Sequence, residues 1–379
     1  MAAAATTART RAVAWVDTGA IERNCALLRA RLGDAQLCAV VKADGYGHGA
    51  LVSAQAALAG GAAWLAVATA NEAEELREEG IDARVLVMGA LTSSELETAL
   101  TADADVVAWT EAFVELARSI ARESGQEARL HVKLDTGMGR LGTKDPVAAL
   151  DLLSRINGAD FVAATGFMTH FATADEPDGA FLDAQLGRFA PAAAEARGRV
   201  PGLVVHAANS AAALREPAAH FDMARCGIAI YGLSPFQRDP AEARLDPALA
   251  LESYVAAVKH VAPGDSVGYG RSWFAEQDTQ VAVVPIGYGD GYRRGLSNSG
   301  DVLIGGRRYP IVGTISMDNL TVDVGEPGRV QVGDPVTLIG GEGKERVLAE
   351  DVAAKLGTIN YEVTTGLTAR VPRVLRASK

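Results

Sequence analysis

The sequence contains little cysteine and no excess of positive charge. Its three cysteines, Cys25, Cys38 and Cys226, are too few and too scattered for a disulfide framework or a zinc site, so we expect no bound metal. Lysine and arginine number 36 against 47 acidic residues, and the net charge of −11 argues against nucleic acid or an anionic membrane as the main partner. Cys38 and Cys226 lie in apolar runs, which predicts ordinary core residues.

The chain also lacks a long apolar segment. No run of its sequence is long enough to span a bilayer, and residues 1–11 contain no apolar stretch of the kind that a signal peptide needs. These first residues are basic and free of acids, which is weakly typical of a transit peptide, but a short tail fits them better. We therefore predict a cytoplasmic location and no membrane partner.

What the sequence does contain is a regular alternation of two kinds of segment. Between about residues 37 and 230, stretches rich in Ala, Glu, Leu and Arg separate short apolar runs. The eight runs are Leu37–Val41, Trp64–Ala68, Arg84–Met88, Asp105–Trp109, Arg129–Leu134, Phe161–Met168, Leu203–His206 and Phe221–Arg225. A strand–helix pair repeated eight times predicts an α/β fold with a (β/α)8 barrel of the TIM type, and a doubly wound sheet is the alternative. Asn71 and Thr110 are predicted helix N-caps, and Gly80 and Gly125 are predicted helix ends.

The pattern changes after about Arg244. Long helical patterns nearly vanish, and short β-like runs follow one another between Gly- and Pro-containing turns. The runs are Tyr254–Val261, Gln280–Ile286, Asp301–Ile304, Tyr309–Val312, Leu320–Val324 and Pro335–Ile339, and one helix is predicted at Leu348–Leu356. We therefore predict a barrel domain at residues 13–244 and a mostly-β C-terminal domain at residues 245–379, with the tail 1–12 as a possible addition to the latter.

The segment Val40–Gly49 carries the first sign of chemistry. Its apolar run ends abruptly in Lys42, and a loop with three glycines follows. In a parallel α/β fold the chemistry lies at the C-terminal ends of the strands, where Lys42 is predicted. Desolvation there lowers the pKa of a lysine, and the neutral amine can form a Schiff base with an aldehyde cofactor. For this residue taken alone, a lysine that extends to solvent is the alternative.

Ionisable side chains follow the ends of other predicted strands as well. They are Lys133, Arg140, His170, His206 and Arg225. A lone histidine or loop arginine is usually a satisfied polar group, but these five and Lys42 converge if the strands are as predicted. We therefore expect an active site at the barrel mouth.

Two kinds of ligand group are suggested by the same loops. Arg140 lies among glycines, in a loop that can fold tightly and aim the guanidinium at a carboxylate. Ser210 and Gly227 follow the last two barrel strands, where barrels commonly bind phosphate through backbone N–H groups. The sequence thus predicts a mouth that binds both a carboxylate and a phosphate.

The β-rich part adds short motifs around Tyr269, Tyr288, Met317 and Tyr361. A tyrosine in a strand is usually packing material, so no motif is informative alone. Together with the segments around Lys42 and Arg140, however, they stand in the order found in the alanine racemases, and the chain resembles that family from about residue 15 to its C-terminus. The resemblance implies pyridoxal 5'-phosphate as cofactor, a barrel followed by a β-domain, and interconversion of L- and D-alanine by a homodimer with active sites at the subunit interface.

The resemblance also implies roles for individual residues. Lys42 binds the cofactor as an internal aldimine and acts as one base, and Tyr269, which reaches the site from the other subunit, acts as the second. The cofactor-binding positions are Lys42, Tyr46, His206, Ser210, Arg225, Gly227, Ile228 and Tyr361. Arg140, Met317 and Tyr269 bind the substrate, Lys133 is a possible carbamate, and Tyr288, Asp175 and Arg294 line the substrate access.

Two bases are needed because racemisation removes the α-proton from one face of the substrate and returns a proton to the other. By resemblance, a network runs from Arg225 through His170 to Tyr269, and His206 braces Arg225. Positive charge near a phenol stabilises its phenolate, so this network would favour Tyr269 as a base. An arginine beside the pyridine nitrogen also disfavours its protonation, because two like charges would meet.

Other readings of the same motifs are possible. Pyridoxal-phosphate decarboxylases share the lysine and a barrel-plus-β architecture, but the Arg140 loop would hold the carboxylate that they expel. A non-catalytic carrier of the cofactor would not need the β-domain with its tyrosine. Within the racemases, a serine or broad-specificity enzyme remains an alternative. The resemblance further implies that the product D-alanine supplies peptidoglycan biosynthesis and that D-cycloserine inhibits the enzyme.

Overall fold

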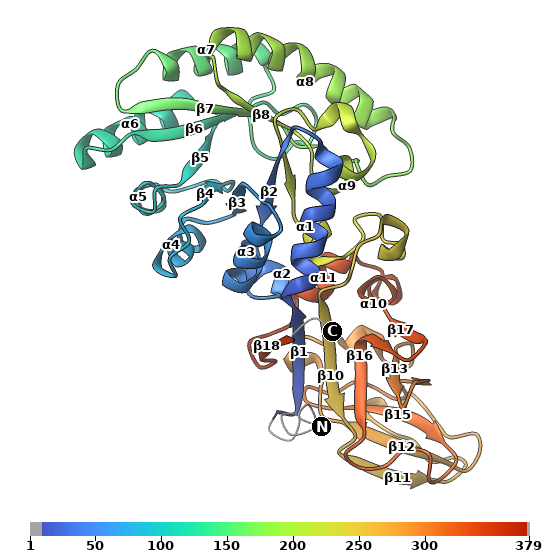
Figure 1. Ribbon diagram of the computed structural model, residues 1–379. Helices are drawn as coiled ribbons and strands as arrows, with labels where there is room; N and C mark the ends of the chain where they lie inside the picture. The colour runs from blue at the N-terminus through green and yellow to red at the C-terminus, as the bar shows by residue number, and fades with distance from the viewer. Residues whose placement is uncertain (1–9, 377–379) are drawn as a thin grey trace. The chain divides into compact units, whose positions relative to one another are not determined.

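The computed structural model describes residues 10–376, and our expectations for residues 1–9 lie outside that range. By its internal contacts the chain divides into two compact units (Figure 1). One unit is Ile21–Ile230. Of the described residues, the other unit combines 10–20 with 231–376.

The unit Ile21–Ile230 is built around a closed barrel of parallel strands, joined in chain order and closed by pairing of the first with the last (Figure 1). The strands are β2 (Gln36–Val40), β3 (Trp64–Val67), β4 (Arg84–Val87), β5 (Asp105–Ala108), β6 (Ala128–Lys133), β7 (Val162–Met168), β8 (Val204–His206) and β9 (Met223–Cys226). The eight predicted runs match them, so the predicted barrel is confirmed and the doubly wound sheet is excluded. These runs are largely apolar because a barrel strand is covered on both faces. Cys38 and Cys226 are fully buried, as predicted.

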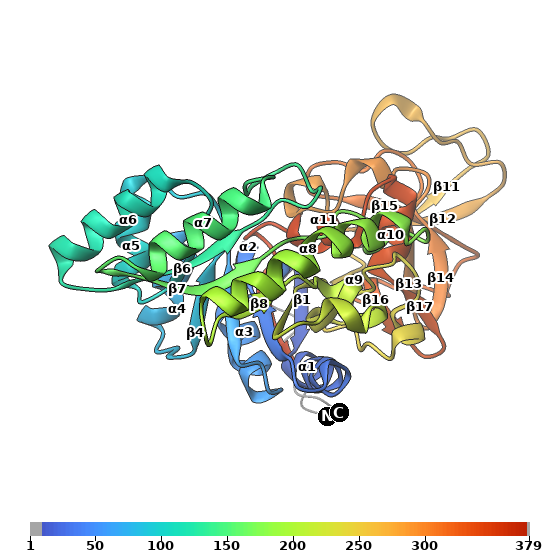
Figure 2. The ribbon, with the colours of Figure 1, turned by 90° about the horizontal axis from the view of Figure 1, so that it is seen from above.

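Helical segments surround the barrel strands. They are α1 (Thr18–Leu32), α2 (Lys42–Gly47), α3 (Ala50–Ala59), α4 (Ala70–Glu78), α5 (Ser93–Thr101), α6 (Glu111–Ser124), α7 (Pro146–Asn157), α8 (Ala180–Arg199) and α9 (Ser210–Arg215). Of these, α1 precedes β2, and the others follow barrel strands. Figure 2 shows α7 and α8 beside β6 and β7. In α6 the buried residues Val114, Ala117 and Ala121 repeat at helical spacing and form the covered face. Within residues 10–376, no helix combines the length and the apolar character needed to cross a membrane.

The ends of the helices can be compared with the N-caps and helix ends predicted from the sequence. Thr110 caps α6 by accepting a hydrogen bond from the Phe113 N–H, and Gly125 ends that helix in the left-handed conformation at φ +69°, both as predicted. The prediction for α4 was wrong, because its N-cap is Thr69 and not Asn71. Thr69 forms a reciprocal capping box with Glu72, which satisfies backbone N–H groups that Asn71 cannot reach from inside the first turn.

The second unit is rich in β-structure, as predicted. Its larger sheet has the order β14-β13-β16-β10-β1-β18, with β17 on β16, and a three-stranded sheet has the order β11-β12-β15. The strands are β1 (Ala12–Asp17), β10 (Leu249–Tyr254), β11 (Ala257–Val261), β12 (Thr279–Val284), β13 (Asp301–Ile304), β14 (Arg307–Pro310), β15 (Leu320–Gly325), β16 (Pro335–Glu342), β17 (Glu345–Val347) and β18 (Arg373–Arg376), and the helices are α10 (Ala349–Leu356) and α11 (Asn360–Thr365). The run predicted at Tyr254–Val261 is divided, because β10 ends in one sheet and β11 begins the other.

The division of the chain differs from the domains predicted at residues 13–244 and 245–379. β1 pairs with β10 in antiparallel fashion and with β18 in parallel fashion, so Ala12–Asp17 belong to the β-rich unit although they precede the barrel in sequence. Its pairing partners lie more than 200 residues away in sequence, and no local pattern reports such a contact.

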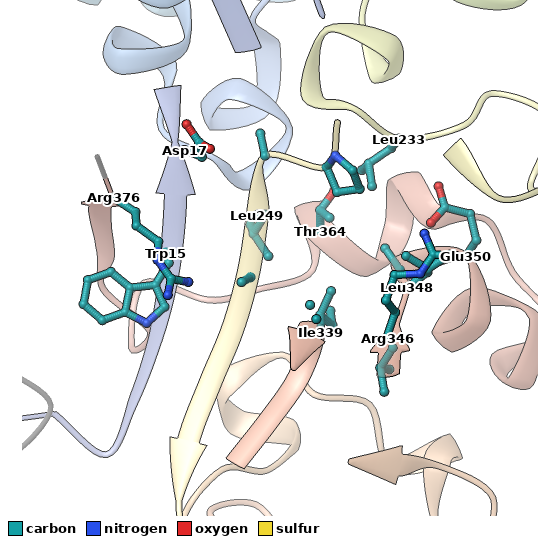
Figure 3. A pocket seen from close by; sticks show the side chains of 17 residues that line it. Trp15, Asp17, Leu233, Leu249, Ile339, Arg346, Leu348, Glu350, Thr364 and Arg376 are labelled. Carbon is teal, nitrogen blue, oxygen red and sulfur yellow. The ribbon is translucent and has the colours of Figure 1, made fainter. Parts of the chain in front are cut away.

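A cavity of about 440 Å³ lies within the β-rich unit (Figure 3). Apolar side chains from several elements form much of its wall, among them Leu233, Leu249, Ile339 and Leu348. Two arginines also line it. Arg346 pairs with Asp239 at 2.6 Å, and the Arg376 guanidinium lies 5.8 Å from the Trp15 ring centroid, so both cations have partners within the chain.

Candidate active site

The ionisable groups predicted at the strand ends meet at one end of the barrel. Lys42 follows β2, Lys133 ends β6 and His206 ends β8, while Arg225 lies in β9. His170 lies just after β7, and the effect of the other groups on its pKa shows that they lie close to it. Burial and then the positive charges of Arg225, Lys133, Arg140 and Lys42 hold the pKa of His170 well below its usual range. The expected convergence on one barrel mouth is therefore confirmed.

An unusual backbone turn follows Lys42. Residues 43–46 all have φ between +51° and +59°, so this turn is left-handed, although only one of the four residues is glycine. Such a conformation costs about 1–2 kcal/mol for each L-residue, and surrounding contacts must hold it. The Glu72 side chain accepts a hydrogen bond from the Ala43 N–H at 2.7 Å, and Asp44 accepts one from the Ala50 N–H at 2.9 Å. The turn thus fixes the backbone next to Lys42 and, with it, the position from which the Lys42 side chain extends.

The Lys42 amine is partly buried and has an altered acidity. Burial, assisted by the positive charge of Arg140, lowers its pKa, and Glu72 acts in the opposite direction. Among residues 10–376 the amine makes no hydrogen bond or ion pair. An amine with a lowered pKa and no partner among the described residues has the properties of a nucleophile or a base.

Arg225 lies near the end of β9 and is only 3% exposed. Its guanidinium donates to His206 Nδ1 at 2.8 Å and to His170 Nδ1 at 3.1 Å, and to the carbonyl oxygens of Thr169 and Ala207. Burial lowers the pKa of Arg225 to about 10, which leaves it a cation at neutral pH. The predicted contacts of Arg225 with His170 and His206 are therefore present.

Lys133 ends β6, and Arg140 lies in the loop that follows. Lys133 is buried, and burial together with the positive charges of Arg225 and Arg140 lowers its pKa to about 8. Asp135 accepts hydrogen bonds from the Gly137 and Gly139 N–H groups, which folds the loop tightly. This loop presents Arg140 as an exposed guanidinium beside the mouth.

The strand ends β8 and β9 form a narrow cradle. The Ser210 hydroxyl accepts hydrogen bonds from the N–H groups of Gly227 at 3.0 Å and Ala229 at 3.4 Å. A side chain at Gly227 would lie 2.3 Å from the Tyr46 hydroxyl, so only glycine allows this approach. Burial raises the pKa of Tyr46 to about 12, which keeps its hydroxyl protonated and able to donate. With Ile228 buried next to them, these groups fit a small anion such as the phosphate of pyridoxal phosphate.

The remaining predicted residues lie elsewhere in the chain. Asp175 is exposed in the loop after β7 of the barrel unit. In the β-rich unit, Tyr269 is 73% exposed and Met317 is 50% exposed. Tyr288 is connected to the Met317 segment, because the N–H groups of Tyr288 and Gly289 donate to the carbonyl oxygens of Ser316 and Met317. Arg294 begins a short 3-10 helix and is exposed.

Tyr361 is held through its neighbour on α11. The Asn360 amide donates to Glu350 and to the Ser234 carbonyl oxygen, each at 2.8 Å. Glu350 also accepts from the Ser234 N–H. Since Glu350 belongs to α10, these buried contacts join α10 and α11 and fix the start of the helix that carries Tyr361.

Sequence reasoning missed three polar residues that support the mouth. Glu72 holds the Lys42 turn, and His131 and Asp105 lie behind His206 inside the barrel. The sequence could have indicated two of them. His131 and Asp105 are polar residues within runs predicted to be buried strands, and a buried polar group needs a partner. Glu72 carried only the capping-box pattern Thr-x-x-Glu.

Comparison with known proteins agrees with this geometry. The family model described as alanine racemase, N-terminal domain, matches residues 16–235, and that of the C-terminal domain matches residues 248–375. An alanine racemase of Mycolicibacterium vanbaalenii is 45% identical over 371 residues, which cover 96% of this chain and 94% of the relative.

Solved structures give the same result. The crystal structure of alanine racemase from D-cycloserine-producing Streptomyces lavendulae has a TM-score of 0.92 at 38% identity and covers 98% of both chains. A Clostridium difficile 630 alanine racemase in complex with cycloserine has a TM-score of 0.88 at 31% identity, covering 97% of this chain and 96% of that one. The chain therefore belongs to the alanine racemase family, the isomerases that interconvert L- and D-alanine.

Proposed function

We propose that the barrel mouth is the active site of this racemase, with Lys42 as the cofactor-binding lysine and Arg225 as the group that faces the cofactor ring. The observation that carries the proposal is the buried Arg225, hydrogen-bonded by His206 and His170 in the same mouth as a lysine with lowered pKa. A cluster of cations in a partly desolvated mouth suits a cofactor with a phosphate and a substrate with a carboxylate.

The cofactor in this proposal is pyridoxal 5'-phosphate. Its phosphate would be bound by Tyr46, Ser210, Gly227, Ile228 and Tyr361. When bound, the cofactor supplies an aldehyde that links to amines and a ring that withdraws electrons, which makes the α-proton of an amino acid acidic. Arg225 would limit how much charge the ring accepts, because a second positive charge beside a guanidinium is unfavourable.

The protein's own part is to hold the substrate and to move two protons. Arg140 and Met317 would hold the substrate, with the Arg140 fork on its carboxylate. Lys42 would take or return the α-proton at one face, since burial lowers its pKa and so favours the neutral amine that accepts a proton. Tyr269 would do the same at the opposite face, and His170, which receives a hydrogen bond from Arg225, would act on Tyr269.

We propose that Tyr269 and Met317 serve the barrel mouth of a second copy, so that the enzyme is a homodimer. Their large exposed fractions support this, because an apolar or aromatic side chain used in catalysis is normally enclosed. Tyr288, Asp175 and Arg294 would line the access to the site, and they are exposed as that role requires.

The physiological setting is part of the same proposal. We propose a cytoplasmic location. The D-alanine product supplies peptidoglycan, and we expect inhibition by cycloserine, which the Clostridium difficile relative binds in its complex.

The test is racemisation by the purified protein, with and without added pyridoxal phosphate. We expect D-alanine from L-alanine, at a rate that depends on the cofactor and exceeds the rate with L-serine. Equal turnover of L-serine would favour the broad-specificity alternative. Release of carbon dioxide from the substrate without D-alanine would favour a decarboxylase, in which Arg140 does not hold the carboxylate.

Lys133 should carry a carbamate that depends on pH. At pH 8 about half of a lysine with pKa about 8 is neutral, against less than about 1% for an ordinary lysine, and only the neutral nitrogen adds carbon dioxide, releasing one proton. We therefore expect the modification to increase as pH rises through 8 and to decrease below 7. The measurement is the intact mass of protein equilibrated with bicarbonate.

The activity should follow the same modification. The added carboxylate would hold Arg140, so we expect Lys133→Ala to lower kcat/KM about tenfold and to abolish any response to bicarbonate. Lys144→Ala, which removes an exposed lysine from the same loop, is the matched control and should behave like wild type. An unmodified mass at pH 9 in saturating bicarbonate would contradict the proposal.

A further inference from the structure

A chain of hydrogen bonds runs from Arg225 through the interior of the barrel. His206 contacts Arg225 with Nδ1, and its Nε2 lies 2.7 Å from His131 Nδ1. His131 Nε2 lies 3.1 Å from Asp105 Oδ2. All four side chains are buried. Asp105 begins β5 and His206 ends β8, so the chain leads from the mouth toward the opposite end of the barrel.

The chemistry of the groups gives this chain one direction. A guanidinium only donates, so His206 Nδ1 must accept, and the proton of a neutral His206 is on Nε2. That proton is donated to His131 Nδ1, which places the His131 proton on Nε2, facing Asp105. Burial, and then the positive charge of Arg225, hold the pKa of His206 well below its usual range, which agrees with the neutral form.

The far end of the chain is anchored by charge. Arg84 and Arg129 both form ion pairs with the Asp105 carboxylate. Burial alone would raise the pKa of Asp105, but the hydrogen bonds from His131 and Arg129 outweigh it and keep the pKa below the usual value. Asp105 is therefore an anion that can only accept, as the direction of the chain requires.

The barrel is shaped to admit the His131 ring. His131 lies opposite Gly166 on β7, where the register of β6 against β7 shifts by one residue. A side chain at Gly166 would lie 2.2 Å from His131 Nδ1, so only glycine leaves room for the ring. Trp64 packs edge-on against the ring at 5.7 Å between centroids. A bulge and a glycine at the same position indicate a built site.

We propose that His131 and Asp105 are positioning residues that fix His206 as the Nε2–H tautomer and thereby hold the Arg225 guanidinium in place at the cofactor ring. The benefit for catalysis rests on the function proposed above for Arg225. Among the described residues, Arg225 donates to two imidazoles and two carbonyl oxygens and to no carboxylate. Asp105 is then its remote counter-charge, joined to it through two polarised imidazoles.

Two substitutions at His131 separate this role from simple packing. Gln can accept from His206 through its oxygen and donate to Asp105 through its nitrogen, so His131→Gln preserves the direction of the chain. His131→Phe keeps a ring of similar shape and removes both hydrogen bonds. If the ring only fills space, Phe should be the better replacement. If the direction of the hydrogen bonds matters, Gln should be the better replacement.

Asp105→Asn tests the proposal independently, because it should reverse the donor–acceptor direction of these hydrogen bonds. The Asn amide can donate to His131 Nε2, which moves the His131 proton to Nδ1 and forces His206 to present Nδ1–H to Arg225, donor against donor. Arg84→Gln is the matched control, because it removes one ion pair of Asp105 and leaves the chain intact. We expect Asp105→Asn and His131→Phe to lower kcat about tenfold or more, while Arg84→Gln and His131→Gln stay within about threefold of wild type.

The decisive measurement is the tautomer of His206, read from nitrogen NMR of protein labelled at its six histidines, with and without pyridoxal phosphate. Wild type should show Nε2–H for both His131 and His206. Asp105→Asn should show Nδ1–H for His206. Wild-type His206 as Nδ1–H, or His131→Phe with wild-type kcat, would overturn the proposal. These spectra do not require catalysis, so an error in the role of Arg225 would appear separately, as failure of Arg225 variants to alter cofactor binding or racemisation.

Discussion

Replacing Lys42 with alanine should reduce racemisation by at least about 10³-fold, because the side chain is proposed both to bind the cofactor and to move a proton. Lys42→Arg should be nearly as inactive. It keeps a positive charge at the mouth but cannot supply a neutral amine at neutral pH. The measurement is D-alanine formation from L-alanine in excess pyridoxal phosphate.

The same lysine can be located chemically. Reduction of the cofactor-loaded protein with borohydride should fix the cofactor on Lys42 and prevent trypsin from cleaving there. The label should then appear in one peptide spanning residues 32–77. Lys344→Ala, at an exposed lysine of the β-rich unit, is the control and should leave both label and activity unchanged. A label on another lysine, or an active Lys42→Ala protein, would disprove the assignment.

The effect of Lys42→Ala on folding should be small. The turn after β2 is held by Glu72 and Asp44 through backbone N–H groups, which an alanine at position 42 does not disturb. The Lys42 amine makes no hydrogen bond to any residue of 10–376. Loss of activity with unchanged thermal unfolding would therefore report on chemistry and not on the fold.

The barrel could be predicted from the sequence because each of its signals is local. A strand covered on both faces has a mostly apolar sequence, and eight such runs alternate with helical stretches along the chain. The rule that chemistry lies at the C-terminal strand ends then brings together residues as distant in sequence as Lys42 and Arg225. That is why the residues of the mouth could be selected before the structure was known.

Features that depend on distant contacts could not be predicted in the same way. β1 has the residues of a strand but pairs with β10 and β18, and nothing near it in sequence specifies those partners. The N-cap of α4 was misplaced by two residues because Asn71 has the right chemistry in the wrong position. The sequence predicts Asp105 and His131 only as parts of strands. Their hydrogen bonds join strands that are distant in sequence, so only the structure shows them.

Tyr269 raises a question that activity measurements on single variants cannot answer, namely which chain supplies it. Tyr269→Phe should reduce racemisation strongly whether Tyr269 acts within its own chain or in a partner. Its side chain is 73% exposed beside a cavity lined by Gly268, Thr314 and Ser316, and Met317, the sequence neighbour of Ser316, is 50% exposed. A surface of this kind suits a second copy of the chain.

Heterodimers of two inactive variants would answer it. Lys42→Ala and Tyr269→Phe chains carrying different affinity tags can be co-expressed, and tandem purification isolates the mixed dimers. If each site takes Lys42 from one chain and Tyr269 from the other, one site in every mixed dimer has both defects and the other has neither. We therefore expect about half of the wild-type activity per dimer.

The alternative gives a qualitatively different result. If both residues act within one chain, each site of the mixed dimer carries one defect, and activity stays at the level of the separate variants. Mixed dimers of wild type with the Lys42→Ala/Tyr269→Phe double variant are the control. Their expected activities are the opposite of those in the first mixture. If each site is built from two chains, both sites carry one defect and the dimer is inactive. If each site is built within one chain, the wild-type chain keeps an intact site. Activity in the first mixture and its absence in the second would together show that the site is built from two copies of this chain.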